Sequence, residues 1–471
     1  MKSSVLLVFL CFLVVFSAGC IRVQHYHAIP LSPSTTAASL QARTLCSPAL
    51  KAFLEQNLGH KLNPWPAKSW NLKMLALAAL YYSPVLEQAR AQVSAAKAAI
   101  VTAGARPNPT IRLQPGVPSP YLFGLDLLFS IQRAGKRKIR VEQAKDLTLA
   151  ARLNLASAAW KVRSGVRTAL VNYLLATHRL GLLYLEQGLQ VRRVKLLQQR
   201  LAAGEISRRM VDNARLSLLQ RHVAIEAAEG HIPESRATLG AAIGIPVTAL
   251  KGIQFVWPGF ERPPNAASIS SELIQREAVL NRLDVRRALA DYAAAQAALQ
   301  LQIARQYPDF QIGPGYHFEE GHNYFTVGYS VTLPIFNRNQ GPIAEAEAQR
   351  KEAAAAFLAT QANAIAQSEE ALARYQGALG ELKGTEEALR QLEHAVIPKE
   401  RRTVDAGEAD QLALNAALLQ RPAMAQTWLM ALGRAQSALG ALEDAVQRPL
   451  NPNEASWPGP VASHNPRKRV P

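Results

Sequence analysis

The feature that most restricts how this chain can fold is an internal repeat with an offset of 199 residues. The segment from Pro84 to Pro109 aligns with the segment that begins at Leu283, and seven alanines, one arginine and one proline coincide. An Ala-Gly-Glu tripeptide and a Leu-Gly dipeptide recur at nearly the same offset, which argues against an accidental alignment of Ala-rich segments. We therefore interpret the protein as a tandem duplication, in which two copies of one supersecondary unit pack on each other.

Each copy is predicted to contain a helix, two short strands, a very long helix, a turn and a returning helix. The first helix should end near Arg106 or Arg305, because the prolines that follow disfavour its continuation. From about Arg137 to Ala203 there is no proline, so a continuous helix of ~67 residues would extend ~100 Å. The segment from about Pro342 to Val404 would reach ~95 Å. Both are far longer than the helices of a compact domain.

Glycines mark where these long helices can bend or end. At Gly181 the first long helix could bend or break. Gly204 and Gly407, each followed by a glutamate, suit a turn from which the chain returns as an antiparallel helix.

An aromatic content of only 7% and abundant Ala, Leu, Gln, Glu and Arg fit long helices with modest cores. We expect an elongated rather than a globular architecture.

The N-terminus predicts export from the cytoplasm. Lys2 precedes an apolar run from Val5 to Phe16, and small residues follow up to Cys20, which together form the three regions of a secretory signal. The segment before Cys20 also resembles the lipobox of bacterial lipoproteins, in which that cysteine carries the lipid, although Leu is usual where Ser17 stands. Ordinary signal cleavage and a retained anchor are the alternatives.

The cysteines and the hydropathy limit what else the chain can be. Cys11 leaves with the signal, Cys20 is the lipidation candidate and Cys46 is expected to be a small buried residue, so no disulfide framework is expected. Beyond the signal there is no run of about 18 uncharged apolar residues. Any membrane span would therefore have to be built from strands.

The two strands of each copy alternate between apolar residues and small or polar residues. One face suits lipid and the other suits water. A half-buried strand on a soluble core would alternate in the same way, but lengths near ten residues, flanking Tyr and Phe, and export favour an outer-membrane β-barrel. The apolar positions are Phe123, Leu125, Leu127, Phe129 and Ile131 in the first copy, and Phe325, Val327, Tyr329, Val331 and Leu333 in the second.

A formal charge of +18 would usually suggest nucleic acid or anionic lipid as a partner. Nucleic acid is not expected to meet an exported chain, and most basic residues are spread along helix faces as a solvated surface. One cluster follows directly after the strand that ends near Ile131, where outer-membrane lipid with anionic headgroups would attract it. A solvated helix start or a lumen lining is the alternative. The cluster consists of Arg133, Lys136, Arg137, Lys138 and Arg140.

Motifs that carry enzyme chemistry are missing from the sequence. There is no glycine-rich phosphate loop, no paired Cys-x-x-Cys and no His-Glu-x-x-His, so we expect no enzyme and no cofactor. The one metal-like cluster contains His317, Glu319, Glu320 and His322. We place it in a solvated loop between two strands, with metal capture as the less favoured interpretation.

Acidic residues flank the two predicted turns. Asp405, Glu408 and Asp410 lie at the second turn, and Glu205 and Asp212 lie at the first. In a symmetric oligomer such groups would form rings, and carboxylate rings select cations or form gates with basic partners. Acidic residues are also favoured near helix N-termini by the helix dipole alone. We single out Asp405 and Asp410 as the candidate aperture residues.

Several motifs resemble the TolC family of outer-membrane efflux proteins, and the resemblance covers nearly the whole mature chain. They are RPNP at the end of the first helix, AGKR from Ala134 to Arg137, LPIFNRNQG from Leu333 to Gly341, and the paired AGE turns. The GKR and NRNQG forms are similar to the CzcC-type branch, which is associated with heavy-metal efflux. The high positive charge departs from what a conduit for cations would need.

The resemblance implies a mainly α fold with a small β part. Long antiparallel helices would form a periplasmic α-barrel, and four strands would contribute to a trimeric outer-membrane β-barrel. Four strands cannot close a barrel, so at least two chains are required on physical grounds alone. The implied function is an exit duct that works with a periplasmic adaptor and an inner-membrane pump, which the branch suggests is proton-driven. The adaptor would dock at Leu201, Gly204, Glu205, Val404, Gly407 and Glu408.

The predicted division of the chain follows the two copies. It comprises a signal peptide at 1–19, a tether and equatorial segment at 20–83, the copies at 84–244 and 281–446, a linker at 245–280, and a disordered tail at 447–471. Other functions remain open: the same duct could serve drug efflux or type I protein secretion. A soluble coiled-coil periplasmic adaptor is a more distant alternative.

Overall fold

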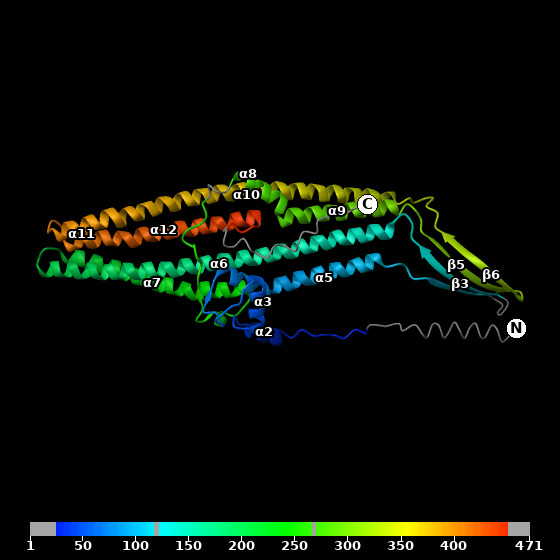
Figure 1. The fold of residues 1–471 in the computed structure, drawn as a ribbon, viewed down its shortest axis with the longest axis horizontal. Helices are drawn as coiled ribbons and strands as arrows, with labels where there is room; N and C mark the ends of the chain where they lie inside the picture. The colour runs from blue at the N-terminus through cyan, green and yellow to red at the C-terminus, as the bar shows by residue number, and fades with distance from the viewer. Residues whose placement is uncertain (1–24, 117–121, 266–269, 451–471) are drawn as a thin grey trace. The chain divides into compact units, whose positions relative to one another are not determined.

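The structure is a computed structural model that describes residues 25–116, 122–265 and 270–450 (Figure 1). Residues up to Ala42 form one unit, whose described helix is α2 (Pro33–Gln41). Residues from Arg43 onward form a second unit that contains every other described helix and strand. The predicted signal peptide, the lipidation candidate Cys20 and the tail from residue 451 lie outside the described residues.

The second unit contains both copies of the repeat, and their element order confirms the predicted mainly helical fold with few strands. The first copy consists of α5 (Pro84–Gly104), β2 (Thr110–Pro115), β3 (Leu122–Ile131), α6 (Lys136–Ala202) and α7 (Arg208–Ile243). The second consists of α9 (Leu283–Ala304), β5 (Phe310–Glu319), β6 (His322–Val331), α10 (Gln340–Gln391), the π-helix η3 (Leu392–Val396), α11 (Ile397–Asp405) and α12 (Gln411–Val446). None of the described helices is both long and apolar enough to cross a membrane.

Shorter elements precede the first copy and separate it from the second. Before it lie α3 (Pro48–Leu58), β1 (Ser69–Trp70) and α4 (Leu72–Tyr82), and between the copies lie the 3-10 helix η1 (Val247–Leu250), β4 (Gln254–Phe255) and α8 (Ser271–Asn281). β1 pairs in parallel with β4, so the two segments are joined. Figure 1 shows the long helices in the order α7, α6, α12 and α10, each packed on the next.

Helix α6 is continuous over 67 residues and would extend ~100 Å at 1.5 Å per residue. It begins after Gly135, whose φ of 67° is the left-handed conformation that glycine adopts at little cost. It passes through Gly181 without interruption, so the break that the sequence left open there does not occur. The second long helix continues from α10 through η3 into α11, and the π-helical turn lies just before Pro398, which has no N–H to donate to the preceding turn.

The main hydrophobic core lies around the middle of α6. Leu170 of α6 is buried together with Leu239 of α7 and Leu432 of α12. Leu75 of α4 and Leu54 of α3 complete the same cluster from the segment before the first copy. Burying such a leucine contributes about 1.5–3 kcal/mol, so this core holds the middle of α6 against its neighbours.

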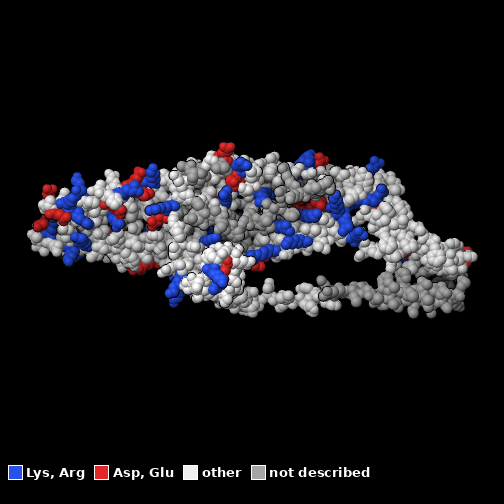
Figure 2. All heavy atoms as spheres, viewed as in Figure 1, with Lys and Arg blue, Asp and Glu red and all other residues white. Residues whose placement is uncertain are grey.

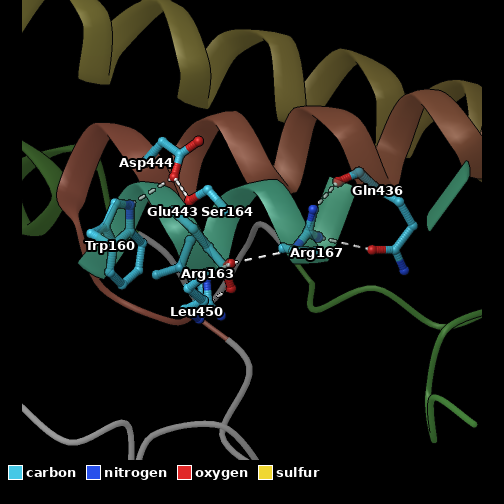
Figure 3. Close-up of polar contacts among 8 residues, drawn as sticks. All are labelled: Trp160, Arg163, Ser164, Arg167, Gln436, Glu443, Asp444 and Leu450. Carbon is cyan, nitrogen blue, oxygen red and sulfur yellow. Dashed lines mark hydrogen bonds and ion pairs between the residues drawn. The ribbon is translucent and has the colours of Figure 1, made fainter. Parts of the chain in front are cut away.

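A buried polar network joins α6 to α12 (Figure 3). Nη1 of Arg163 and Nε of Arg167 lie 3.0 and 3.4 Å from Oε2 of Glu443, and all three residues are at most 3% exposed. Arg167 also donates to the side-chain oxygen and the carbonyl of Gln436. A Cβ at Gly440 would lie 2.5 Å from an Arg167 nitrogen, so glycine makes room for this guanidinium. The network couples the first copy to the second.

Cys46 is exposed, and the expectation that it would be buried is wrong. It lies just before α3, and its backbone carbonyl, not its thiol, makes the tertiary contact by accepting a hydrogen bond from Nε1 of Trp65 at 3.2 Å. The backbone contact just before α3 leaves the side chain of Cys46 at the surface, although a thiol is apolar enough to be buried.

Candidate functional site

The strands β2, β3, β5 and β6 form one antiparallel sheet in that order, with an apolar face. Residues paired in register lie on the same side of a sheet, and on one side the pairs match apolar with apolar except for Phe318 and Asn323. Phe325 and Val327 of β6 are 86% and 76% exposed. An exposed apolar surface of this extent marks contact with lipid or protein. This face carries Ile111, Leu113, Phe123, Leu125, Leu127, Phe129, Ile131, Phe310, Ile312, Tyr316, Phe318, Phe325, Val327, Tyr329 and Val331; Leu333 follows the end of β6.

The opposite face of the sheet is mainly small and polar, although it also carries Leu122, Leu128 and Tyr324. Its glycines are Gly124, Gly313, Gly315 and Gly328, and its polar residues include Arg112, Gln114, Asp126, Ser130, Gln311, His317, Thr326 and Ser330. Asp126 is only 8% exposed, and its Oδ1 accepts a hydrogen bond from Nε2 of His317 at 3.2 Å. The sheet therefore places most apolar side chains on one face and most polar side chains on the other, as the alternation predicted.

The location predicted for the metal-like cluster is partly wrong. His317 lies within β5 and His322 is the first residue of β6, so neither belongs to a loop. Only Glu320 and Gly321 form the turn, both with positive φ. Glu319 and His322 face each other at the end of the strand pair. The described residues contain no group of three or more side chains placed to hold a metal ion.

The basic cluster lies where β3 passes into α6, and Lys136 within it points inward. Lys136 is 7% exposed, and its Nζ donates to the carbonyl of Tyr307 at 2.6 Å and to Oδ1 of Asp309 at 2.7 Å. The backbone N–H of Arg133 donates to the same oxygen at 3.1 Å. Tyr307 and Asp309 lie between α9 and β5, so Lys136 fastens the start of α6 to the second copy.

Two further members of the cluster cap a neighbouring helix. Nε of Arg137 donates to the carbonyl of Gly104 at 2.6 Å, and Nε of Arg140 donates to that of Ala103 at 3.3 Å. These are carbonyls of the last turn of α5, which have no partner within the helix. Lys138 is exposed. The side chains of Lys136, Arg137 and Arg140 thus serve internal contacts.

The two glycine turns have the predicted conformation and are equivalent in both copies. The φ angles are 76° at Gly204 and 77° at Gly407. The N–H of Glu205 donates to the carbonyl of Arg200 at 2.9 Å, and that of Glu408 donates to the carbonyl of Thr403 at 2.9 Å. With the bonds from each glycine to the carbonyls of Leu201 and Val404, these form two Schellman motifs.

The six residues expected to meet an adaptor differ in exposure. Gly204, Glu205, Gly407 and Glu408 are exposed, and Val404 is half-buried. Leu201 packs against a small core that includes Val194, Leu197 and Val211. The glycines and glutamates therefore present the turns, and Leu201 supports one of them from below.

The two candidate aperture residues have different surroundings. Asp405 ends α11 and is exposed. Asp410 is the N-cap of α12, where Oδ1 accepts a hydrogen bond from the N–H of Ala413 at 2.8 Å, and its Oδ2 forms an ion pair with Arg200. Nε of Arg200 also lies 3.7 Å from Oε2 of Glu205. Asp410 thus combines a local capping role with a link between the copies.

Sequence reasoning missed two charged residues that link α6 to the returning helices. Arg200 was not singled out, nor was Glu186, which is 8% exposed. Glu186 forms an ion pair with Arg221 of α7 at 2.8 Å and accepts a hydrogen bond from Gln426 of α12 at 3.0 Å, so it joins three helices. In the sequence both residues look like ordinary charges on a long solvated helix, and no spacing sets them apart.

Charge is distributed unevenly over the elements. Figure 2 shows many Lys, Arg, Asp and Glu side chains close together over the end where α11 meets its turn, and few over the sheet. The sheet and the turns are therefore chemically different sites, one apolar on its exposed face and the other of mixed charge.

Comparisons with known proteins agree with this architecture. The model of the family described as outer membrane efflux protein matches residues 75–245 and 274–446. The cobalt-zinc-cadmium resistance protein CzcC of Cupriavidus metallidurans is 28% identical over 285 residues, which cover 59% of this chain and 66% of CzcC. The pyoverdine export outer membrane protein OpmQ of Pseudomonas aeruginosa is 25% identical over 228 residues, 46% of each chain. This chain thus matches less than two thirds of either relative.

Among solved structures, the outer membrane protein VceC from Vibrio cholerae has a similar fold. The TM-score is 0.63 at 20% sequence identity, and the match covers 80% of this chain and 95% of VceC. At this identity the likeness concerns the fold alone. The family match, however, spans both copies of the repeat and more than half of the chain. The chain belongs to the outer membrane efflux protein family.

Proposed function

We propose that this protein is the outer-membrane exit duct of a tripartite efflux system and that it acts without catalysis or a cofactor. The observation that carries the proposal is the direct succession, in both copies, of a two-faced strand pair and a very long helix. The apolar face of the sheet suits lipid, and the polar face suits an aqueous lumen. At 1.5 Å per residue, α6 would continue that lumen ~100 Å into the periplasm.

The duct requires several copies of the chain. The described sheet has two open edges, β2 and β6, and unpaired strand edges buried in lipid would leave backbone groups without hydrogen bonds. We propose a homotrimer whose twelve strands close on themselves, as the family resemblance implies.

The partners that we propose lie at the two ends of the long helices. The exposed turns around Gly204 and Gly407 would receive a periplasmic adaptor protein, which connects the duct to an inner-membrane pump driven by protons. At the other end, exposed Lys138 remains available to anionic outer-membrane lipid.

We also propose that an acyl chain on Cys20 adds an N-terminal anchor. The protein should then be labelled by radioactive palmitate, and labelling that persists in Cys20→Ala would refute the anchor.

For the cargo we propose divalent transition-metal cations. The similarity to CzcC supports this, because the name of that protein specifies resistance to cobalt, zinc and cadmium. The similarity to OpmQ, a pyoverdine export protein, makes an organic cargo the second candidate. The exposed carboxylate of Asp405 at the turn end would attract cations on their way into the duct.

Two measurements test the proposed function. The purified protein, reconstituted in planar bilayers, should give discrete single-channel currents, and it should migrate in gels as an oligomer that heating dissociates. In the native bacterium, deletion of the gene should lower tolerance to cobalt, zinc or cadmium salts, and the intact gene should restore it. A protein without currents would overturn the duct, whereas unchanged metal tolerance with intact currents would overturn only the metal cargo.

A further inference from the structure

The Asp126–His317 pair on the polar face of the sheet connects the two copies. Asp126 belongs to β3 and His317 to β5, and these strands pair in antiparallel register. In that register Asp126 lies opposite Gly315 and His317 lies opposite Gly124. The two side chains therefore meet diagonally, each over the glycine of the neighbouring strand.

Both glycines are necessary for this arrangement. A Cβ at Gly315 would collide with Oδ1 of Asp126 and with Oγ1 of Thr326. A Cβ at Gly124 would lie 2.9 Å from Nδ1 of His317, closer than a real Cβ contact. Any larger residue at either position would displace the carboxylate or the imidazole. The sheet thus provides a fitted recess for one acid and one histidine.

The distance within the pair matches that between two ligands of one metal ion. Nε2 of His317 and Oδ1 of Asp126 are 3.2 Å apart. Ligand atoms about 2.1 Å from a zinc-like ion, at angles between octahedral and tetrahedral, are separated by roughly 3.0–3.4 Å. An ion could therefore enter between the two atoms with little movement of either side chain. The proton on Nε2 would move to Nδ1 through solvent, so that a neutral imidazole binds the metal.

We propose that Asp126 and His317 form a transient binding site for a divalent transition-metal ion on the lumen side of the sheet. This inference rests on the proposed function, since it names a stopping place for the proposed cargo. Two protein ligands, with water completing the coordination, bind more weakly than the three or four ligands of catalytic and structural sites. Weak binding suits a conduit, because an ion must be able to leave as readily as it enters.

The charges around the pair keep its affinity low. Arg112 of β2 lies opposite Asp126 on the same face of the sheet, and its cation opposes a bound metal ion. Tyr324 of β6 lies opposite His317, and Thr326 lies opposite Gly315. Further toward the turn, Glu319 lies opposite His322 and adds one negative charge. Arg112 is therefore the residue whose removal should strengthen binding.

The first test measures block of single-channel current by zinc chloride in planar bilayers. Unmodified protein should show reversible block. The concentration for half block should rise by about tenfold or more in Asp126→Asn and in His317→Gln, and it should fall in Arg112→Gln. His322→Gln is the matched control, because it removes a histidine from the same face outside the pair, and its block should equal that of unmodified protein. Magnesium chloride should block none of them.

The second test needs no variant and no current. Diethyl pyrocarbonate modifies accessible histidine nitrogens, and mass spectrometry of peptides from the detergent-solubilised oligomer measures the modification of each histidine. Zinc chloride should protect His317 and leave His25 and His222 unaffected. Equal modification of His317 with and without zinc, or identical block in all variants, would overturn the site. Absence of any current would instead overturn the duct, while protection of His317 would still report binding.

Discussion

The guanidinium of Arg200, near the end of α6, forms an ion pair with the carboxylate of Asp410, which also caps the first turn of α12. The pair links the long helix of the first copy to the returning helix of the second. Both side chains are more than one third exposed, so solvent screens the pair and it adds only about 0.2–1 kcal/mol to stability. A weak link between two helices beside the turns is suited to opening and closing.

The first prediction concerns this link. Asp410→Asn should increase the open probability in planar bilayers, because asparagine caps a helix about as well as aspartate but cannot form the ion pair with Arg200. Arg200→Gln should raise the open probability at least as much, because it also removes the weaker contact with Glu205, and adding Asp410→Asn to it should have no further effect. Asp405→Asn is the control for open probability, since it removes a nearby charge without breaking the pair; its loss should change only the cation conductance that Asp405 is proposed to support. Equal changes of open probability in Asp405→Asn and Asp410→Asn would show that the local charge matters and the pair does not.

The second prediction concerns the buried network in Figure 3. Glu443→Gln keeps the size of the side chain but removes the carboxylate that Arg163 and Arg167 share. Removing one partner of a buried pair costs about 3–5 kcal/mol, so thermal unfolding followed by circular dichroism should occur at a clearly lower temperature. Glu381→Gln breaks the exposed pair with Arg434 and should cost less than about 1 kcal/mol. Similar losses in both variants would contradict the proposed role of burial.

The third prediction concerns acid stability. Burial alone would raise the pKa of Asp284, but hydrogen bonds and charge from Arg282 and the N–H of Val285 outweigh it and leave the pKa lowered. The folded state therefore favours the carboxylate, and its contribution to stability is complete above the ordinary aspartate pKa of about 3.9. It is lost as the pH falls through the lowered value.

Asp284→Asn tests this dependence. The variant should unfold at a lower temperature than the unmodified protein near neutral pH, and the difference should shrink as the pH falls below the ordinary aspartate value. Thermal unfolding of both proteins over a series of acidic buffers measures it. A difference that stays constant over the whole series would mean that the charge of Asp284 is not responsible.

The fourth prediction concerns the two faces of the sheet. Val327→Arg places a charge on the apolar face and should destabilise insertion by about 2–4 kcal/mol if the residue lies near the midplane of the membrane. Thr326→Arg, one position earlier, places the same charge on the polar face and should be milder. The yield of heat-modifiable oligomer in outer-membrane fractions measures both. Equal yields would contradict contact between Val327 and lipid.

The fifth prediction separates two lysines of the basic cluster. Lys136→Gln should lower thermal stability in any lipid by about 1–3 kcal/mol, because it removes the ion pair between buried Lys136 and half-buried Asp309. Lys138→Gln should leave the fold intact and weaken only the preference for anionic lipid, by about 1 kcal/mol per chain. Reconstitution in liposomes with and without anionic lipid measures both effects. If neither variant changes the lipid dependence, the cluster has no anchoring role.

Sequence reasoning was most successful where the signal is local. The alternation in β3 and β6 depends on successive side chains pointing to opposite faces, and Gly204 and Gly407 have the left-handed conformation that ends their helices. Sequence reasoning was least successful where the residues around a side chain come from distant parts of the chain. His317 was expected in a loop but lies in a strand beside Asp126, and Cys46 was expected inside but is exposed.

By itself, the sequence determined the duplication, the order of helices and strands within each copy, the unusual length of the long helical segments and the positions of their turns. These depend on residues close together in the chain. Only the tertiary structure decided how the charged residues are used. Lys136 and Lys138 look alike in the sequence, yet one is buried against Asp309, 173 residues away, and the other is exposed. The reason is physical: partners such as Asp309 come from the other copy, and the packing of helices against one another, not spacing along the chain, brings them into contact.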